Sequence, residues 1–339
     1  MTDPHYMVKH SPGKGSGVFA LRPRAAGTCV MEDRAVMKIP MTSLQFGDEE
    51  IRSSFEALTA AQKAQFLALH EGHRSVNTRL ARISNANAFG IHNDASYLYL
   101  DVSRINHSCC PNAAVGEIAD AMQILAIRPI EKGEEIFISY HSMMTGMTRQ
   151  QRQNYLHWSY GFNCDCAVCS RKGREGQLSD ARRRIINALT ASVQGYQPSD
   201  FSPYDGPTHE ENIPRHRYVS WQSKLTTPLF PHQKLAHSFL LAGVLEAEGL
   251  MDRSVARAYN NAATILIGLM YEHKDIYILP AALYVRQWME KSIAVVCEVC
   301  GATSPELLEI ALGNNAALKA DASVCAVAGA VLDPAVCVT

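Results

Sequence analysis

The segment Asn106–Asn112, with the sequence NHSCCPN, puts two amides, a histidine, a serine and two thiols into one turn between two β-like runs. A simple connection between strands needs little side-chain chemistry, and functional side chains concentrate in such loops. A lone histidine in a turn is more often a structural residue than a ligand. The dense polar surroundings of His107 nevertheless make this segment a candidate site, whose chemistry depends on its partners elsewhere in the chain.

Three more cysteines stand close together in Cys164–Cys169, with the sequence CDCAVC. Three thiols at this spacing suit one soft cation, and Zn²⁺ prefers four tetrahedral ligands. The fourth ligand must come from elsewhere, and Cys109 or Cys110 is the obvious source; three unbound thiols are the alternative. The chain has ten cysteines, and its first residues, MTDPHYMVKH, lack the apolar core of a secretory signal. This favours thiols or metal over disulfides, and an intracellular protein, cytoplasmic or nuclear.

The glycine-rich segment Gly13–Gly17, with the sequence GKGSG, is similar to a dinucleotide-binding loop at first sight. However, no strand precedes it, its third glycine comes too soon, and a β-like run follows where a helix should begin. We therefore reject a Rossmann fold. The segment instead predicts a turn whose bare backbone can approach a ligand closely.

The segment Glu131–Tyr140, with the sequence EKGEEIFISY, predicts a turn, then a strand, then a tyrosine at the end of that strand. A strand-end tyrosine is usually half-buried packing.

Composition limits the class of protein. The chain has 339 residues, which predicts about two domains, and its formal net charge is −1. This balance carries no electrostatic signature of a nucleic-acid or anionic-membrane protein. The longest apolar run, residues 322–332, is too short to span a bilayer. We therefore expect no nucleic-acid partner and no membrane partner.

The pattern changes about halfway along the chain. Short β-like runs in the first half cover Gly17–Ala20, Thr28–Met31, Tyr97–Leu100, Met122–Ile127 and Ile136–Tyr140. A capping box at Thr59 and Gln62 indicates a helical insert at about 41–80.

After Cys169 the pattern is helical. An apolar stripe at Ile185, Ile186, Leu189 and Val193 follows the basic run Arg182–Arg184, which we interpret as a solvated helix face. The proline-rich segment 197–215 predicts a loop or linker, and further helices are expected at 231–248, 252–272, 278–297 and 304–319.

In this order, the motifs resemble those of the SET-domain lysine methyltransferases, in particular the branch with a split SET domain and a helical C-terminal domain. That branch includes the SET-and-MYND enzymes and their fungal relatives. The motifs are GKGSGVFA near 14–20, NAF at 87–89, NHSCCPN at 106–112, GEEIFISY at 133–140 and YGFNCDCAVC at 160–169. The resemblance covers about half of the chain, from residue 10 to residue 170. The partner-binding MYND zinc finger is absent, because residues 41–80 contain no cysteine.

The resemblance implies an α+β fold. It predicts a β-rich, knotted SET domain at residues 1–141 with a helical insert at about 41–80, in which the NHSC segment threads beneath a loop from the end of the domain. A zinc-binding post-SET segment follows at 142–172. An all-α C-terminal domain is expected at 173–320 and a C-terminal tail at 321–339.

The resemblance also implies the site residues. The cofactor S-adenosylmethionine is expected to lie against the backbone of Lys14, Gly15, Ser16 and Gly17. Its polar groups are expected to be held by Asn87, Asn106 and His107, with Tyr140 beside it and Phe162 stacked on the adenine. Tyr140 and Tyr160 are the expected catalytic tyrosines, and Phe89 and Tyr160 are expected to line a lysine channel. Zn²⁺ is expected on Cys109, Cys164, Cys166 and Cys169.

The resemblance implies transfer of a methyl group to the side-chain amine of a protein lysine, by an enzyme that we expect to be a monomer. Transfer requires a neutral amine, and an apolar channel next to a sulfonium would lower the pKa of the lysine. Two alternatives remain. One is a SET-type enzyme with a small-molecule biosynthetic substrate, such as an amine. The other is a catalytically silent SET scaffold that binds a partner protein.

Overall fold

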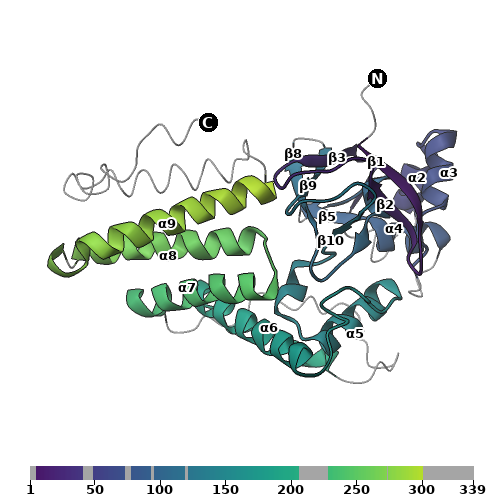
Figure 1. The fold of residues 1–339 in the computed structure, drawn as a ribbon. Coiled ribbons are helices and arrows are strands. Elements are labelled where there is room, and N and C mark those ends of the chain that lie inside the picture. Colours follow the sequence, from purple (N-terminus) through teal and green to yellow (C-terminus); the bar gives the residue numbers. More distant parts are fainter. Residues whose placement is uncertain are drawn as a thin grey trace. The chain divides into compact units, whose positions relative to one another are not determined.

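The computed structural model describes residues 5–40, 49–72, 78–92, 95–118, 121–205, 228–272 and 274–300. The chain divides into two compact units. The N-terminal unit comprises residues 1–144, 149–171 and 202–214, and the helical unit comprises residues 145–148, 172–201 and 215–339. Strands and short helices make up the described part of the first unit, and helices make up that of the second, as expected for an α+β protein (Figure 1).

Ten strands of the described residues form three small sheets in the N-terminal unit. The first sheet has the order β1 (Tyr6–Ser11), β2 (Gly15–Ala20), β10 (Glu135–Ile138) and β7 (Asn106–His107). The second has the order β3 (Cys29–Arg34), β9 (Ala121–Ala126) and β8 (Ala113–Ile118). The third has the order β4 (Met37–Pro40), β6 (Ala95–Leu98) and β5 (Phe89–His92). The sequence had indicated β2, β3, β6, β9 and β10, with β6 two residues later than it lies.

The pairing of β7 with β10 positions the candidate site. These two strands are parallel, with Phe137 opposite Asn106 and Ile138 opposite His107. The backbone N–H of Ser108 extends the pairing by donating to the carbonyl of Ile138 at 3.0 Å. The NHSC segment therefore lies alongside β10. Buried apolar residues of the first two sheets, among them Val18, Ile124 and Ile136, form the core beneath it.

Among the described residues between β4 and β5 there are three helices: α2 (Glu49–Glu56), α3 (Ala60–Leu67) and α4 (Arg79–Asn87). Thr59 caps α3 in the expected capping box with Gln62. The helices bury Ile51, Phe66 and Ile83 in a second core that they share with β4 and β6. Helical structure thus extends beyond the segment at 41–80, because α4 continues to Asn87, the first residue of the NAF motif.

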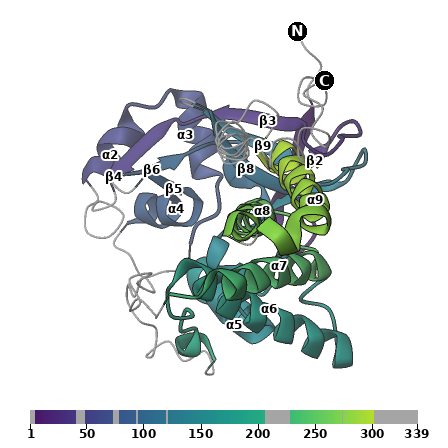
Figure 2. The ribbon, with the colours of Figure 1, turned by 90° about the vertical axis from the view of Figure 1, so that its left-hand side faces the viewer.

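The helical unit contains α6 (Gly173–Gln194), α7 (Pro231–Glu248), α8 (Arg253–Glu272) and α9 (Lys274–Cys300). Figures 1 and 2 show each helix beside the next. The helices expected at 231–248, 252–272 and 278–297 are confirmed, whereas the one expected at 304–319 lies outside the described residues. Among the described helices, none is long and apolar enough to cross a bilayer.

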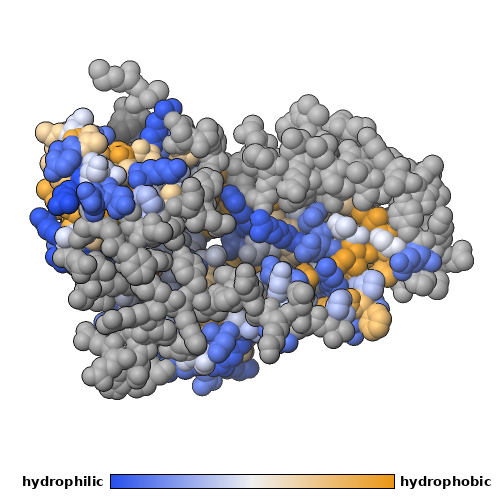
Figure 3. Space-filling model, turned by 180° about the vertical axis from the view of Figure 1, so that it is seen from behind, coloured by the Kyte–Doolittle hydropathy of each residue, from blue (hydrophilic) through white to orange (hydrophobic). Residues whose placement is uncertain are grey.

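Two expectations for α6 are wrong. Ile185 is 43% exposed, although Ile186, Leu189 and Val193 are buried as expected. Arg183 is not solvated but buried, and its Nε donates to the buried carboxylate of Glu248 at 3.1 Å. The basic run therefore supplies the counter-charge for an acidic side chain on α7, a pairing that local sequence does not reveal. Phe239, Leu240 and Tyr284 of this unit are exposed. Hydrophobic and hydrophilic residues lie next to one another on the face that Figure 3 shows.

Candidate active site and metal centre

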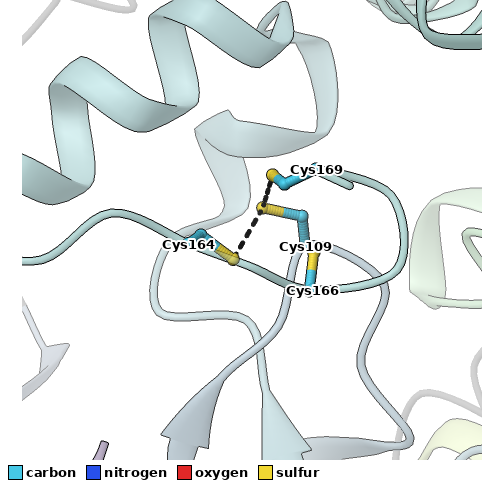
Figure 4. A group of neighbouring side chains, drawn as sticks. All are labelled: Cys109, Cys164, Cys166 and Cys169. Carbon is cyan, nitrogen blue, oxygen red and sulfur yellow. Dashed lines mark hydrogen bonds between the residues drawn. The ribbon is translucent and has the colours of Figure 1, made fainter. Parts of the chain in front are cut away.

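Four sulfur atoms meet in the N-terminal unit. The Sγ atoms of Cys109, Cys164, Cys166 and Cys169 all lie within 4.8 Å of one another (Figure 4). Cys109 Sγ is 3.9 Å from Cys164 Sγ and 3.6 Å from Cys169 Sγ. Four thiolates about 2.3 Å from one tetrahedral Zn²⁺ lie at such separations, so the donor set fits zinc. The choice that the sequence left open falls on Cys109, since Cys110 lies outside this cluster.

Helix α5 (Arg149–Tyr160) packs against this thiol cluster. The sequence analysis does not predict this helix. Arg152 is completely buried, and its Nη2 lies 3.6 Å from Cys169 Sγ. The side chain of Gln153 holds both backbone groups of Cys164. Its Nε2 donates to the carbonyl at 2.6 Å, and its Oε1 accepts from the N–H at 2.8 Å. A centre of four thiolates and Zn²⁺ has a charge of −2, and the buried guanidinium compensates part of it.

The surroundings of the thiols also alter their acidity. Hydrogen bonding to the thiols of Cys109 and Cys164, together with the charge of Arg152, lowers the pKa of Cys169 to about 7. A thiol must lose its proton to bind metal, so this environment favours the ligand form of Cys169. Hydrogen bonds to the neighbouring thiols and burial instead raise the pKa of Cys109.

The expected glycine-rich turn is present, but the expectation that no strand precedes it is wrong, because the turn connects β1 to β2. Gly13 and Gly15 both have φ of +75°, and nothing lies within 4 Å of a Cβ built on either. The backbone here is open to a ligand. The Lys14 ammonium lies 3.2 Å from the Asp165 carboxylate, which stands between two cysteines of the thiol cluster.

Glu135 joins this turn to the NHSC segment, a role that the sequence did not suggest. Its carboxylate accepts from Ser11 Oγ at 2.9 Å and from Asn106 Nδ2 at 2.7 Å. Asn106 Nδ2 also donates to the carbonyl of Ser16 at 3.0 Å. A Cβ at Gly17 would collide with the Glu135 carboxylate, so glycine allows this close approach. The only signal in the sequence was a second acidic residue in GEEIFISY.

Asn87 ends α4 and is buried. Its Nδ2 donates to the carbonyls of Ile83 and His70, each at 2.7 Å. The ring of His70 in turn lies 3.3 Å from the carbonyl of Tyr160. Asn87 thus belongs to the same region as Tyr160, although its amide nitrogen is engaged by the protein backbone.

An aromatic cluster of His107, Tyr140, Tyr160 and Phe162 surrounds the end of β10. Ring centroids of Tyr140 and Tyr160 are 4.9 Å apart, and Phe162 lies 6.3 Å from both Tyr140 and His107. The ring of Phe89 instead meets Tyr99 edge-on at 5.9 Å, and it borders the same core as Tyr140. Tyr140 therefore lies beside two aromatic residues from the segment that ends α5, Tyr160 and Phe162, whereas the ring of Phe89 pairs with Tyr99.

The hydroxyl of Tyr140 donates to the carbonyl of Ile105 at 2.9 Å. Loss of water around this hydroxyl, together with the negative charges of Glu135 and Cys164, raises the pKa of Tyr140 above its ordinary value of 10. The phenol is therefore neutral at physiological pH. With its proton directed at Ile105, its oxygen lone pairs remain to accept a hydrogen bond from a ligand.

Residues 15–141 match the family model for the SET domain. This range includes Asn106, His107 and Tyr140, and it ends before α5 and the three clustered cysteines. This part of the chain is a SET domain. Over 184 residues the chain is 30% identical to the histone-lysine N-methyltransferase set5 of Schizosaccharomyces pombe, covering 53% of this chain and 56% of that protein.

Over 104 residues it is 34% identical to the N-lysine methyltransferase SMYD2 of Gallus gallus, covering 29% of this chain and 23% of that one. For the human SMYD2 the identity is 32%, covering 29% of this chain and 24% of that protein. The chain thus spans about half the length of set5 and about a quarter of SMYD2. The expected resemblance to the branch of the SET-and-MYND enzymes is confirmed.

Proposed function

We propose that this protein transfers a methyl group from S-adenosylmethionine to the side-chain amine of a lysine in a protein substrate. The observation that carries the proposal is the position of Tyr140. Its neutral phenol lies beside Tyr160, Phe162 and His107, one strand away from the glycine-rich turn of the SET domain. Relatives named as lysine methyltransferases support the same reaction.

The residues around β2 and β7 suit this cofactor. The turn at Lys14, Gly15 and Ser16 offers N–H and carbonyl groups to its polar atoms, whereas Gly17 is buried against Glu135, and the Lys14 ammonium complements the carboxylate of the cofactor. Glu135 fixes the amide of Asn106 toward the turn. The ring of Phe162 offers a face for the adenine. S-adenosylmethionine, when bound, supplies a methyl group carried by a positively charged sulfur.

The aromatic side chains prepare the lysine. A free lysine has a pKa near 10.4, so nearly all of it is protonated at neutral pH. Rings of Tyr140, Tyr160 and Phe89 replace water around the amine, which disfavours its charged form and lowers its pKa. The Tyr140 oxygen then accepts a hydrogen bond from the neutral amine and directs its lone pair, since alignment provides much of the rate in such a transfer. The proton lost beforehand goes to water.

The four cysteines are proposed to hold structural Zn²⁺. A closed set of four thiolates leaves no position for a substrate, so the metal would stabilise the segment that carries Phe162 rather than take part in the chemistry. Reduced thiols require a reducing compartment, which supports an intracellular location, cytoplasmic or nuclear.

The experiment that tests the function supplies radiolabelled S-adenosylmethionine to the purified protein with a protein extract or with a metabolite extract. Label on lysine in the protein fraction, identified by mass spectrometry, is the expected result. Label in the metabolite fraction alone would instead indicate a small-molecule enzyme. Cofactor binding without transfer to either fraction would indicate a silent scaffold, and both of these outcomes would overturn the proposal.

A further inference from the structure

The imidazole of His107 makes two hydrogen bonds that point in different directions. His107 lies on β7 and is 4% exposed. Its Nε2 lies 3.2 Å from Cys109 Sγ, and its Nδ1 lies 3.2 Å from the backbone nitrogen of Tyr140. One ring thus touches both a member of the thiol cluster and the backbone of the proposed catalytic tyrosine.

The backbone partner determines which ring nitrogen carries the proton. The N–H of Tyr140 can only donate, so Nδ1 must accept and carries no proton. A neutral imidazole then has its proton on Nε2, which donates to the sulfur of Cys109. Both hydrogen bonds are made by a single tautomer, with no change of protonation.

The strand pairing explains why the ring can bridge the two groups. His107 stands opposite Ile138 on the parallel strand β10, and Tyr140 follows two residues later. Cys109 follows His107 by two residues on the other chain segment. The ring therefore spans the place where both segments leave the sheet, and its centroid lies 5.2 Å from that of Tyr140.

We propose that His107 is a positioning residue that connects the metal ligand Cys109 to the backbone of Tyr140. Its Nε2–H stabilises the thiolate of Cys109, and its Nδ1 fixes the start of the turn that carries the phenol. The link to Cys109 stands independently of the reaction, whereas the consequence for catalysis rests on the proposed function. This assigns to the side chain of His107 a task different from the expected contact with the cofactor.

Loss of the hydrogen bond to Cys109 and loss of the hydrogen bond to Tyr140 would have different effects. Loss of a hydrogen bond to a metal ligand typically lowers metal affinity by about 10- to 100-fold. Loss of the bond to Tyr140 leaves the metal in place but frees the tyrosine to move, and a displacement of about 1 Å is enough to lower a transfer rate by about 100-fold. A residue that only fills space would not separate these two effects.

Two substitutions of His107 each keep only one of the two hydrogen bonds that the imidazole makes. In His107→Asn the side-chain amide reaches the position of Nδ1 and keeps an acceptor for the Tyr140 N–H. In His107→Gln the amide reaches the position of Nε2 and keeps a donor for Cys109. We expect zinc affinity, measured by competition with a chromogenic chelator, to fall about 10- to 100-fold in the Asn variant. It should change by less than about 3-fold in the Gln variant.

We expect the opposite order for kcat at saturating zinc and cofactor, with the larger loss in the Gln variant. His232→Asn, at an exposed position of α7, is the matched control and should change neither quantity. Equal loss of zinc affinity in both His107 variants, or no loss in either, would overturn the link to Cys109. If zinc affinity differs between the two His107 variants as expected but kcat does not, the link to Tyr140 is wrong.

The tautomer supplies a test that needs no activity. In ¹⁵N-labelled histidine spectra of the zinc-loaded protein, the signals of His107 are identified by their absence in His107→Asn. We expect a protonated Nε2 and an unprotonated Nδ1. A proton on Nδ1 would refute the proposal even if methyl transfer is observed. Conversely, this tautomer without methyl transfer would leave the proposed function, and not the link, in error.

Discussion

At the scale of single residues, the site depends on side chains that hold distant segments together. Tyr140 donates to the carbonyl of Ile105, and Glu135 accepts from the side chains of Ser11 and Asn106 on the two edge strands of the first sheet. Both stand at or just beyond the same short strand, β10, but five residues apart. Each fixes a segment that is distant in the sequence, so substitution of one of these side chains should alter the position of that segment.

Tyr140→Phe tests the proposed role of the phenol. The change removes one oxygen and keeps the ring, so contacts with Tyr160 and Phe162 persist. We expect the transfer rate to fall about 100-fold or more, because the amine loses the acceptor that directs it. The Kd of S-adenosylmethionine, measured by calorimetry, should change by less than about 3-fold. Tyr196→Phe, at an exposed position, is the control, and an unchanged rate in Tyr140→Phe would remove Tyr140 from its role.

The acidity of Tyr140 predicts how stability depends on pH. Its pKa is raised in the folded state, so the fold favours the protonated phenol. This contribution is complete below the unfolded pKa of about 10 and is lost as the pH rises above it. We expect the free energy of unfolding in urea to fall between about pH 9.5 and 11, and to fall less steeply in Tyr140→Phe. Parallel curves for the two proteins would contradict the shift.

Gly17→Ala tests the close approach of Glu135. The added methyl group would displace a carboxylate that Ser11 and Asn106 hold in place. We expect a loss of about 1–3 kcal/mol in unfolding free energy, measured by urea titration, and weaker cofactor binding. Adding Glu135→Ala should recover part of the stability lost to the methyl group. Gly243→Ala, where the new methyl group meets nothing within 4 Å, is the control. Purely additive effects in the double variant would contradict the collision.

At the scale of elements, α5 connects the two halves of the site. Its second turn carries Arg152 and Gln153 against the thiol cluster, and its last residue is Tyr160 in the aromatic cluster. Four residues later the chain reaches Cys164. The helix thus fixes the distance between the side chains that hold the thiol cluster and a proposed substrate contact. Its buried face is unusually polar because Arg152 serves that cluster, while Gln151 and Asn154 donate to Asp205 and to the carbonyl of Tyr204.

Arg152→Met tests the counter-charge on α5. Methionine fills much of the volume but removes the positive charge beside Cys169. We expect zinc affinity, measured by chelator competition, to fall about 10- to 100-fold, because the buried negative centre loses its compensation. Arg152→Lys should lose less, since it keeps the charge but not the planar fork. Arg174→Met, at an exposed position of α6, is the control; a similar loss in both methionine variants would exclude a specific effect.

At the scale of the whole molecule, each unit has its own buried polar centre. The N-terminal unit contains the thiol cluster with Arg152, and the helical unit contains Glu248 with Ser179, Arg182 and Arg183. Within the described residues, every side chain of each centre belongs to its own unit. The two centres can therefore be perturbed separately.

Glu248→Gln tests this separation. Glu248 and Arg183 are both buried, so neutralising the carboxylate removes the charge that faces this guanidinium at 3.1 Å. Breaking a buried ion pair in this way costs about 3–5 kcal/mol, and we expect a corresponding fall in thermal stability by calorimetry. Zinc content, measured by atomic emission, should stay unchanged. Chelation of zinc, in contrast, should destabilise the N-terminal unit, and a loss of zinc in Glu248→Gln would contradict the independence of the two centres.

Much of the fold could be read from local patterns. The strands at Gly15–Ala20 and Glu135–Ile138, the cap at Thr59 and the long helices after residue 230 depend on alternation, capping and helical periodicity, which neighbouring residues encode. The strand at Tyr6–Ser11 was missed because four of its six side chains are exposed, so it lacks an apolar pattern. Helix α5 was missed for a related reason, since its buried face includes Gln151, Arg152 and Asn154.

The sequence by itself determined the SET motifs, the three clustered cysteines and the tyrosine at the end of its strand, because each is a short segment whose residue types suffice. Only the tertiary structure decided that Cys109 rather than Cys110 joins the cluster, that Arg183 is buried, and that His107 bridges sulfur and backbone. These choices depend on which way a side chain points and on what a distant segment brings to it. Burial then makes every polar group find a partner, and that partner is selected by packing rather than by neighbours in the chain.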